Sequence, residues 1–243
     1  MTDTDLVVVA AHPDDAELCC GGWLALAADR GQRAAVVDLS RGELATNGTV
    51  DARSSEAAAA AAVLGLAARD NLGLPDGGIA ADDPEQLAAL VGALRRLRPG
   101  LLLAPWTEAR HPDHAAAGQL AIRAAFFAGL VRYRPDLGAP HRPRRLLQYP
   151  ERIDARAELV VDIGAAVERK WAAIRCYGSQ LSGAATSLTR ALGLDAFAVR
   201  DRYWGAAIGV EHGEPYLLGA PVPISDPVTH FTTHPAVPVL VPR

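Results

Sequence analysis

The sequence has few cysteines, a small net charge and no long apolar run, and each of these shortages excludes a class of protein. Only 3 of its 243 residues are cysteine, and Cys19 and Cys20 are adjacent in an apolar segment, which predicts a reduced chain without a disulfide framework. The formal net charge of -4 argues against general binding to nucleic acid, because such binding needs a basic surface. No apolar run approaches about 18 residues, and we therefore expect no membrane span.

Two further signals are missing, a secretion signal and the glycine fingerprint of dinucleotide-binding enzymes. The sequence begins with Asp3 and Asp5 rather than with a basic segment and an apolar core, and we expect a cytoplasmic protein. The first apolar run, Val7–Ala10, is followed by the letters AHPDD at Ala11–Asp15, where a dinucleotide-dependent oxidoreductase would carry Gly-x-Gly-x-x-Gly. The sequence therefore disfavours that class of enzyme.

Short apolar runs alternate with helical segments over the first half of the chain. Such alternation is typical of a mostly parallel sheet with helices on both faces, and it predicts an α/β, Rossmann-like three-layer fold. Residues 1–218 are expected to form a single domain, and the proline-rich residues 219–243 an arm or tail. The expected strands are Val7–Ala10, Ala34–Leu39, Asp70–Leu74, Leu101–Pro105, Leu146–Tyr149 and Glu158–Ile163, and the expected helices are Glu17–Arg30, Asp51–Leu64, Pro84–Leu97, His114–Gly129, Ala165–Tyr177 and Leu188–Tyr203.

Two clusters of histidine and aspartate follow the first and fourth of these strands. The first cluster contains His12, Asp14 and Asp15, and the second has the letters HPDH at His111–His114. Ligands of open α/β sheets bind beyond the carboxyl ends of the strands, and so both clusters are expected on one rim. Imidazole and carboxylate are ligands of zinc, and a catalytic zinc takes three protein ligands and leaves a position for water. The sequence thus predicts a metal site at the carboxyl ends of the strands, where iron, cobalt or manganese would also be accepted.

These two motifs make the sequence similar to the PIG-L/LmbE-like zinc-dependent N-acetylglucosamine deacetylases. The similarity spans residues 5–218, and further segments resemble the bacterial branch that deacetylates N-acetyl-α-D-glucosaminyl L-malate in bacillithiol biosynthesis. The resemblance implies that this compound is the substrate and that acetate is released. It also implies a homo-oligomer such as a hexamer. The further similar segments are Asp38–Leu44, Asn47–Thr49, Arg53, Asn71–Asp76, Tyr177–Gln180 and Ile208–Glu211.

For the metal site, the resemblance implies that His12, Asp15 and His114 bind Zn2+. Asp14, the neighbour of a ligand, would act as the general base that takes a proton from the attacking water. Each of these roles has a plainer alternative, because a histidine can fill the core and Asp14 can cap the helix that follows.

For the other catalytic groups, the resemblance implies that His111 assists the oxyanion or the departing amine and that Asp113 orients it. Tyr203 would help to bind the oxyanion, with an ordinary core position as its alternative. Arg53 lies in the first turn of an expected helix, where the helix dipole disfavours a cation, and this suggests a ligand or a partner for it. Three residues would contact the sugar or its malate substituent, namely Arg53, Asn47 and Arg110.

Two other functions stay open at this point. A related deacetylase or amidase would act on a different conjugate of N-acetylglucosamine, such as a mycothiol-type glucosaminyl inositol or a chitooligosaccharide. A non-catalytic, Rossmann-like binding protein would need neither a base nor metal ligands, and the complete set of both argues against it. In each case the expected partner is a small molecule, and neither nucleic acid nor a membrane is expected.

Overall fold

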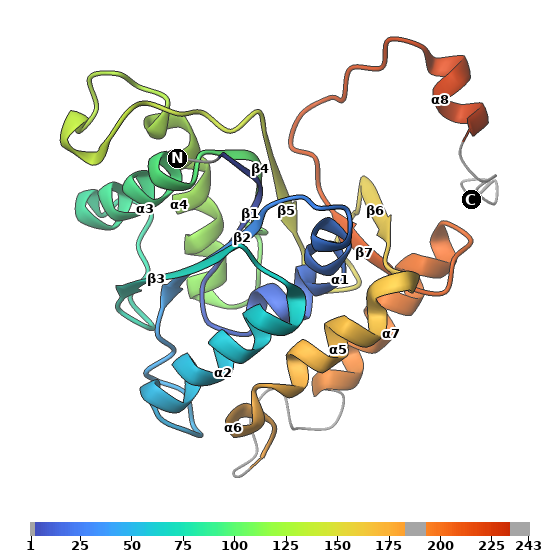
Figure 1. Ribbon diagram of the computed structural model, residues 1–243, viewed down its shortest axis with the longest axis horizontal. Helices are drawn as coiled ribbons and strands as arrows, with labels where there is room; N and C mark the ends of the chain where they lie inside the picture. The colour runs from blue at the N-terminus through green and yellow to red at the C-terminus, as the bar shows by residue number, and fades with distance from the viewer. Residues whose placement is uncertain (1–2, 183–192, 234–243) are drawn as a thin grey trace.

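Five parallel strands form the central sheet of the protein (Figure 1). The computed structural model of the chain describes residues 3–182 and 193–233. In spatial order the strands are β3 (Ala68–Leu74), β2 (Ala34–Ser40), β1 (Thr4–Ala10), β4 (Pro99–Pro105) and β5 (Arg145–Tyr149). The order reverses at β1, which pairs with β2 on one side and with β4 on the other. The edge beyond the carboxyl ends of β1 and β4 is therefore the place where such a sheet binds ligands.

Helices cover both faces of the sheet and complete the predicted three-layer α/β fold (Figure 1). Alternate residues of β1 point to opposite faces, so that Val8 belongs to one apolar core and Val7 and Val9 belong to the other. Because both faces are covered, β1 is buried at every position except Asp5, and all of its residues from Leu6 to Ala10 are apolar. The first core contains residues of α1 (Asp15–Asp29), α2 (Val50–Leu64) and α5 (Val167–Arg175), and the second contains residues of α3 (Pro84–Leu97) and α4 (Pro112–Ala128).

A second, smaller sheet follows β5 in the chain. It consists of β6 (Leu159–Asp162) and β7 (Gly213–Tyr216), which pair in antiparallel fashion. A main-chain bridge between Gln148 and Leu217 joins the end of β7 to β5. The sequence analysis did not predict β7, whereas the other strands lie close to their expected positions. The remaining short elements are η1 (Pro135–Leu137), which precedes β5, and η2 (Gly164–Ala166) and α6 (Gly178–Leu181), which follow β6.

The helix α7 (Gly193–Ala207) covers the described part of the segment predicted as helix Leu188–Tyr203, of which residues 188–192 lie outside the described residues. Residues 219–233 then lead away from the rest of the chain and end in α8 (Pro227–Thr233), as Figure 1 shows. All of residues 219–230 are exposed. The segment predicted as an arm therefore contains a short helix, and residues 234–243 of that prediction lie outside the described residues.

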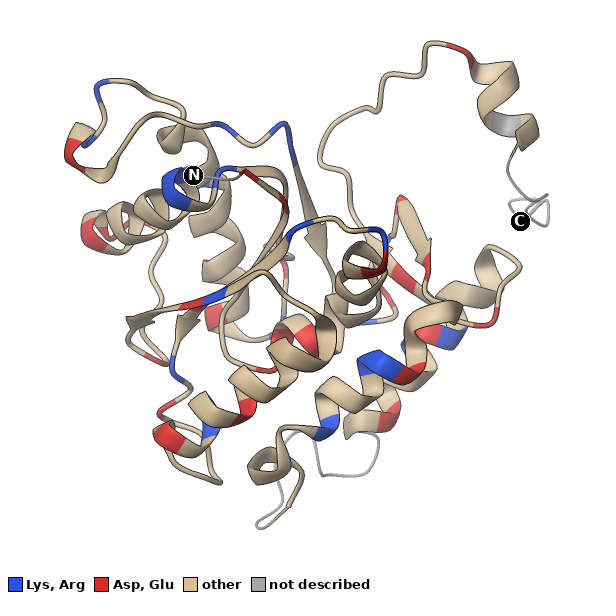
Figure 2. Cartoon of the chain, viewed as in Figure 1, with Lys and Arg blue, Asp and Glu red and all other residues tan. Residues whose placement is uncertain are grey.

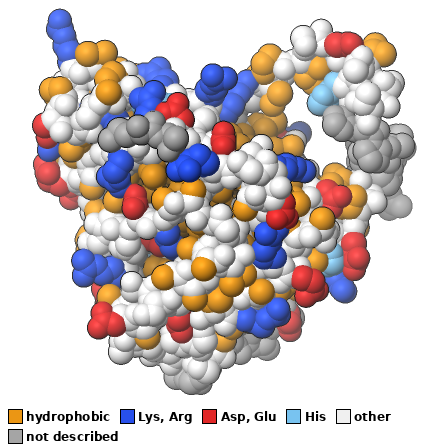
Figure 3. Space-filling model, in the orientation of Figure 1, with side chains coloured by type: hydrophobic (Ala, Val, Ile, Leu, Met, Phe, Trp, Pro, Cys, Tyr) orange, Lys and Arg blue, Asp and Glu red, His pale blue; other side chains and the backbone are white. Residues whose placement is uncertain are grey.

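Two features of the helices and the surface bear on possible partners. Among the described residues, no helix combines the length and the apolar character that a membrane crossing requires. On the face of the molecule seen in Figure 3, basic and acidic side chains are interspersed. That face therefore presents no extended field of one sign.

Candidate metal centre

The turn between β1 and α1 carries the first cluster at the carboxyl edge of the sheet. β1 ends at Ala10 and α1 begins at Asp15, so that His12 and Asp14 lie in the connecting turn. Asp14 has a φ of 110°, in the left-handed region that residues other than glycine rarely adopt. Its side chain makes no hydrogen bond that caps α1. The structure therefore does not support the helix-cap alternative for Asp14, and the unusual backbone conformation is typical of a functional position.

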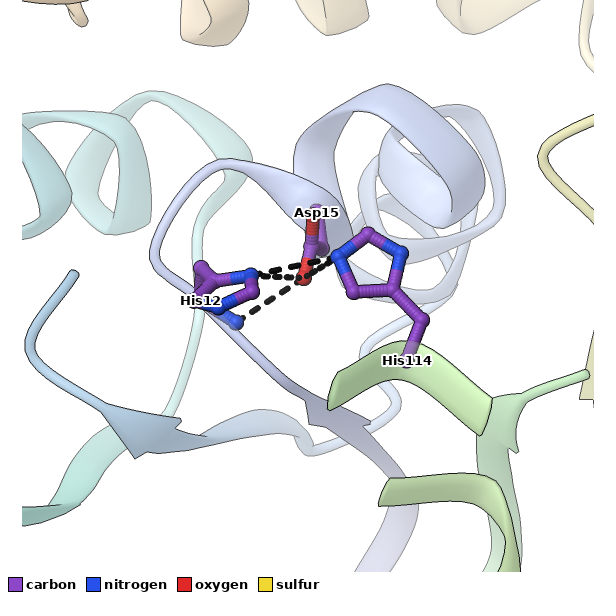
Figure 4. Close-up of side chains that lie close together, drawn as sticks. All are labelled: His12, Asp15 and His114. Atoms are coloured by element: carbon purple, nitrogen blue, oxygen red, sulfur yellow. Dashed lines mark hydrogen bonds and ion pairs between the residues drawn. The ribbon is translucent and has the colours of Figure 1, made fainter. Parts of the chain in front are cut away.

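His12, Asp15 and His114 converge on one point at this edge (Figure 4). His12 Nδ1 lies 3.1 Å from His114 Nε2 and 3.5 Å from Asp15 Oδ2, and His114 Nε2 lies 3.3 Å from Asp15 Oδ2. All three residues are buried. Donor atoms that share a tetrahedral zinc ion at about 2.0–2.2 Å lie about 3.3–3.6 Å from one another. The chemistry and the spacing of this donor set therefore fit a metal ion.

Three carboxylates bond the outward-facing nitrogens of these two imidazoles. His12 Nε2 lies 3.1 Å from Asp76 Oδ1 and 3.3 Å from Asp113 Oδ2, and His114 Nδ1 contacts the carboxylate of Glu151. Such outer hydrogen bonds fix the tautomer and the ring orientation of a metal-binding histidine. His12 Nδ1 and His114 Nε2 are thereby left to face the centre.

Asp76 and Glu151 are site residues that the sequence analysis did not identify. Asp76 follows β3 after one proline, and Glu151 follows β5 in the same way. A signal for both was present, because a polar residue just beyond the carboxyl end of a strand is placed on the same rim as the two clusters. Neither residue has a histidine beside it, and so neither forms a motif that composition alone distinguishes from a turn.

His111 lies against the rings of both histidines. Its ring centroid is 4.7 Å from that of His114 and 5.1 Å from that of His12. Its Nδ1 accepts a hydrogen bond of 3.2 Å from the backbone N–H of Asp113, in the position that caps α4. Because Nδ1 is an acceptor, the neutral ring carries its proton on Nε2.

The partner of the Asp113 carboxylate differs from the predicted one. Its Oδ2 accepts a 2.7 Å hydrogen bond from the backbone N–H of Gly77 and also contacts His12. The expectation that this carboxylate orients His111 is corrected accordingly, since it is the backbone N–H of Asp113 that bonds His111. The loop after β3 carries Gly77 to the Asp113 carboxylate, which contacts both this backbone N–H and the His12 ring.

Arg53, which the sequence placed in an unfavourable position at a helix start, has its partners within the chain. Its Nη2 donates to Asp14 Oδ2 at 2.9 Å and to the Pro13 carbonyl at 2.6 Å, and its Nη1 donates to Gln180 Oε1 at 3.3 Å. Arg53 is only 7% exposed. The guanidinium thus holds the turn that carries Asp14, which confirms the inference of a partner, and its contact with a substrate stays a prediction.

The other residues predicted to contact the substrate or the oxyanion lie in different surroundings. The Asn47 carbonyl accepts a 2.9 Å hydrogen bond from Gln180 Nε2, which places Asn47 beside the partner of Arg53. Arg110 is exposed and directly precedes His111. Tyr203 is 52% exposed, and its ring packs edge-to-face on Trp204, which makes a core role wrong. The structure does not bring Tyr203 into contact with the three converging side chains, and its catalytic role stays a prediction.

The two neighbouring carboxylates of the turn differ in their electrostatic surroundings. Burial raises the pKa of Asp14 to about 7, although the Arg53 guanidinium opposes this shift. Burial acts on Asp15 as well, but the imidazoles of His114 and His12 outweigh it and lower the pKa of Asp15 below its usual range. Identical side chains one residue apart thus have different environments, which is a common arrangement at catalytic sites.

Comparisons with known proteins give matches over the part of the chain that holds this site. Residues 7–125 match the profile of the family described as PIG-L, GlcNAc-PI de-N-acetylase. The chain is 32% identical over 190 residues to 4-oxalmesaconate hydratase of Pseudomonas putida, and the match covers 72% of this chain and 73% of that enzyme. It is 34% identical over 173 residues to 1D-myo-inositol 2-acetamido-2-deoxy-alpha-D-glucopyranoside deacetylase of Streptomyces avermitilis, over 58% of this chain and 59% of that enzyme.

A solved structure agrees with the fold as well. The crystal structure of a conserved protein from Thermus thermophilus superposes with a TM-score of 0.82 at 43% sequence identity, and it covers 91% of this chain and 96% of that chain. The three-layer arrangement and the strands that carry the converging side chains are thus shared with an independently determined structure.

Proposed function

The chain belongs to the PIG-L family, and from this membership we propose that it is a metal-dependent hydrolase that removes the acetyl group from a conjugate of N-acetylglucosamine. The observation that carries this proposal is the convergence of His12, Asp15 and His114 with the Asp14 carboxylate one residue from a ligand. The proposed metal is zinc, for which two imidazoles and a carboxylate are an ordinary catalytic ligand set. The decisive assay is release of acetate from N-acetylglucosaminides by the pure protein.

The residues around the centre can divide the chemistry of amide hydrolysis between them. Zinc, when bound by His12, Asp15 and His114, would polarise the amide oxygen and lower the pKa of a water toward about 7. Asp14 is held beside the ligands by Arg53, and its carboxylate takes the proton of the water whose oxygen bonds to the acyl carbon.

His111 has the position and the tautomer to stabilise the charge that develops on the acyl oxygen. Because its Nδ1 accepts from the backbone of Asp113, its Nε2–H can donate a hydrogen bond to the developing oxyanion. The proton that Asp14 has taken from the water then passes to the departing amine. The bond between the acyl carbon and nitrogen then breaks, and the products are acetate and the free glucosamine conjugate. Protonation of the leaving nitrogen by a positioned side chain contributes to the rate in the same way as the general base.

Removal of a single ligand tests the metal centre. The variant His114→Ala is expected to be purified with much less zinc than the wild type, because a centre of three ligands loses one donor. His141→Ala is a matched control, since His141 Nε2 bonds the carbonyl of Pro99 at 2.8 Å, at the opposite end of β4 from the site. Elemental analysis of both variants gives the answer, and near-stoichiometric zinc in His114→Ala would remove this residue from the ligand set.

Within this class, N-acetyl-α-D-glucosaminyl L-malate is the proposed substrate. Arg110 is exposed beside His111 and can pair with a malate carboxylate. Such an ion pair contributes about 1.5–3 kcal/mol, and so kcat/KM should be about 10- to 100-fold higher for this compound than for free N-acetylglucosamine. Arg110→Met should reduce the ratio, whereas Arg142→Met, next to Phe126 near the far end of α4, should not.

The panel of substrates for this measurement includes the N-acetylglucosaminyl inositol and N,N'-diacetylchitobiose, which represent the two alternative conjugates. Equal kcat/KM values for the malate conjugate and for free N-acetylglucosamine would reject the malate substrate and leave the deacetylase in place. A preference for the inositol conjugate would move the assignment to the mycothiol-type alternative.

A second candidate function comes from the similarity to 4-oxalmesaconate hydratase, which covers 73% of that enzyme at 32% identity. A hydratase adds water across a carbon–carbon double bond and releases no acetate. The two functions are therefore distinguished by incubating the protein with 4-oxalmesaconate and following the loss of its conjugated absorbance, in parallel with the acetate assay.

A further inference from the structure

Four charged side chains are fully buried behind the metal centre. They come from helices α5 and α7, which Figure 2 shows side by side with basic and acidic residues on both, and from β7. Lys170 Nζ donates to Asp201 Oδ2 at 2.6 Å and to Glu214 Oε1 at 2.8 Å. Arg200 donates to Asp201 Oδ1 from Nε at 3.0 Å and from Nη2 at 2.7 Å. None of the four is more than 1% exposed.

The guanidinium of Arg200 also bonds two backbone carbonyls from separate parts of the chain. Its Nη2 donates to the carbonyl of Leu18 at 2.9 Å, and its Nη1 donates to the carbonyl of Pro150 at 3.1 Å. Leu18 lies in α1, one turn after Asp15, which is the first residue of that helix. Pro150 directly precedes Glu151, whose carboxylate contacts His114. Arg200 therefore links the backbone of α1, which carries the ligand candidate Asp15, to the segment that carries Glu151, the partner of His114.

The same cluster engages the backbone of α1 at a second place. The backbone N–H groups of Gly22 and Trp23 donate to Glu214 Oε1 and Oε2 at 2.8 and 2.9 Å. Leu18 and Gly22 form an i, i+4 pair of the helix, and both of their backbone groups bond to side chains of the cluster. The position of α1 relative to α7 is thus set by hydrogen bonds as well as by apolar packing.

We propose that Arg200 is a positioning residue of the metal centre, which keeps Asp15 and the Glu151–His114 pair in register by bonding the carbonyls of Leu18 and Pro150. This inference rests on the proposed metal centre. A guanidinium is suited to the task because its planar array of donors is fixed by Asp201 and reaches both carbonyls at once. A lysine at the same position has the charge, but its three N–H groups share one nitrogen, and so they do not reproduce the separate bonds of Nη1 to Pro150 and Nη2 to Leu18.

The test compares zinc affinities of two matched variants, Arg200→Lys and Arg95→Lys. Arg95 is also buried, at 3% exposure, and also donates to backbone carbonyls, but these lie in residues 128–138. Ala128 is 14 residues along α4 from His114, which corresponds to about 20 Å. The two substitutions therefore make the same chemical change near to and far from the centre.

The zinc dissociation constant is measured by competition with a chelator at a temperature where both variants are folded. Arg200→Lys is expected to raise it about 10-fold, the low end of the effect of removing an outer hydrogen-bond partner, and Arg95→Lys is expected to leave it unchanged. An unchanged constant in folded Arg200→Lys would overturn the role of Arg200. Wild-type protein that binds no zinc would instead contradict the proposed function itself.

Hydrogen exchange of the wild type tests the inference without any substitution, and so it decides the case where Arg200→Lys fails to fold. If Arg200 couples α7 to the centre, zinc should slow the exchange of amides in α7 around Arg200, because coupling between two positions is reciprocal. The coupling would be contradicted if zinc protected the turn at His12 from exchange but left the exchange of the α7 amides unchanged.

Discussion

Asp14→Asn should keep its bound zinc and lose about 10²- to 10⁴-fold in turnover, which is the usual contribution of a general base. The amide retains the shape of the carboxylate and can still accept from Arg53, but it cannot take a proton from water. Asparagine also tolerates the left-handed backbone conformation that Asp14 adopts, with its φ of 110°. The substitution therefore changes the chemistry with little change to the turn.

The neighbouring variant Asp15→Asn provides the matched control, because it makes the same change one residue away. Asp15 Oδ2 lies within 3.5 Å of both His12 Nδ1 and His114 Nε2, and its loss should weaken metal binding. Part of its lost activity should return when zinc is added in excess. Zinc content and acetate release are measured for both variants, and the two roles must be exchanged if Asp14→Asn is the variant that loses the metal.

The fold could be predicted from the sequence because its strands are short and buried on both faces. The run Val7–Ala10 has an apolar residue at every position, which a strand needs only where helices cover both sides of the sheet. The two clusters could be placed together because each follows the carboxyl end of its strand, and parallel strands have these ends at one edge of the sheet. The convergence of His12 and His114 follows from that topology, because β1 and β4 are neighbours.

The outer partners of the histidines could not be predicted, because they depend on how the loops fold over the rim. The turn after β3 reaches across the centre, where Asp76 bonds His12 and the backbone N–H of Gly77 bonds Asp113. Hydrophobic periodicity determines which face of a strand or helix is buried, but it carries no information about such loop contacts. Arg53 was the exception, since its conflict with the helix dipole is a local property that already indicated a partner.

The buried charges were also beyond sequence analysis. Lys170 and Glu214 have the composition of surface positions, and charged residues are almost never fully buried unless they are paired. Their pairing joins residues that are 44 positions apart. The strand that carries Glu214 has only four residues and includes a proline, and so its own sequence did not indicate a strand.

Lys170→Met should lower the free energy of unfolding by about 3–5 kcal/mol, the usual cost of breaking a buried ion pair by removal of one partner. In the wild type the cluster is neutral, with two cations and two carboxylates, all four fully buried. Within the four-residue cluster, the substitution leaves Arg200 as the one cation for Asp201 and Glu214. The loss in the free energy of unfolding is measured by urea denaturation, with one m value fitted to all variants. Arg96→Met is the control, because the pair of Arg96 with Asp70 is half exposed and should contribute less than about 1 kcal/mol.

A second substitution shows whether uncompensated charge, rather than lost packing, causes this loss. Glu214→Gln in the Lys170→Met background makes the cluster neutral again, and the amide oxygen can still accept from one of the two backbone N–H groups of α1 that the carboxylate bonds in the wild type. Because replacing both partners of a buried pair costs far less than removing one, the double variant should regain at least about 1 kcal/mol relative to Lys170→Met. If the two losses simply add, the cost of Lys170→Met comes from its packing against α1, and the four charges do not act as a unit.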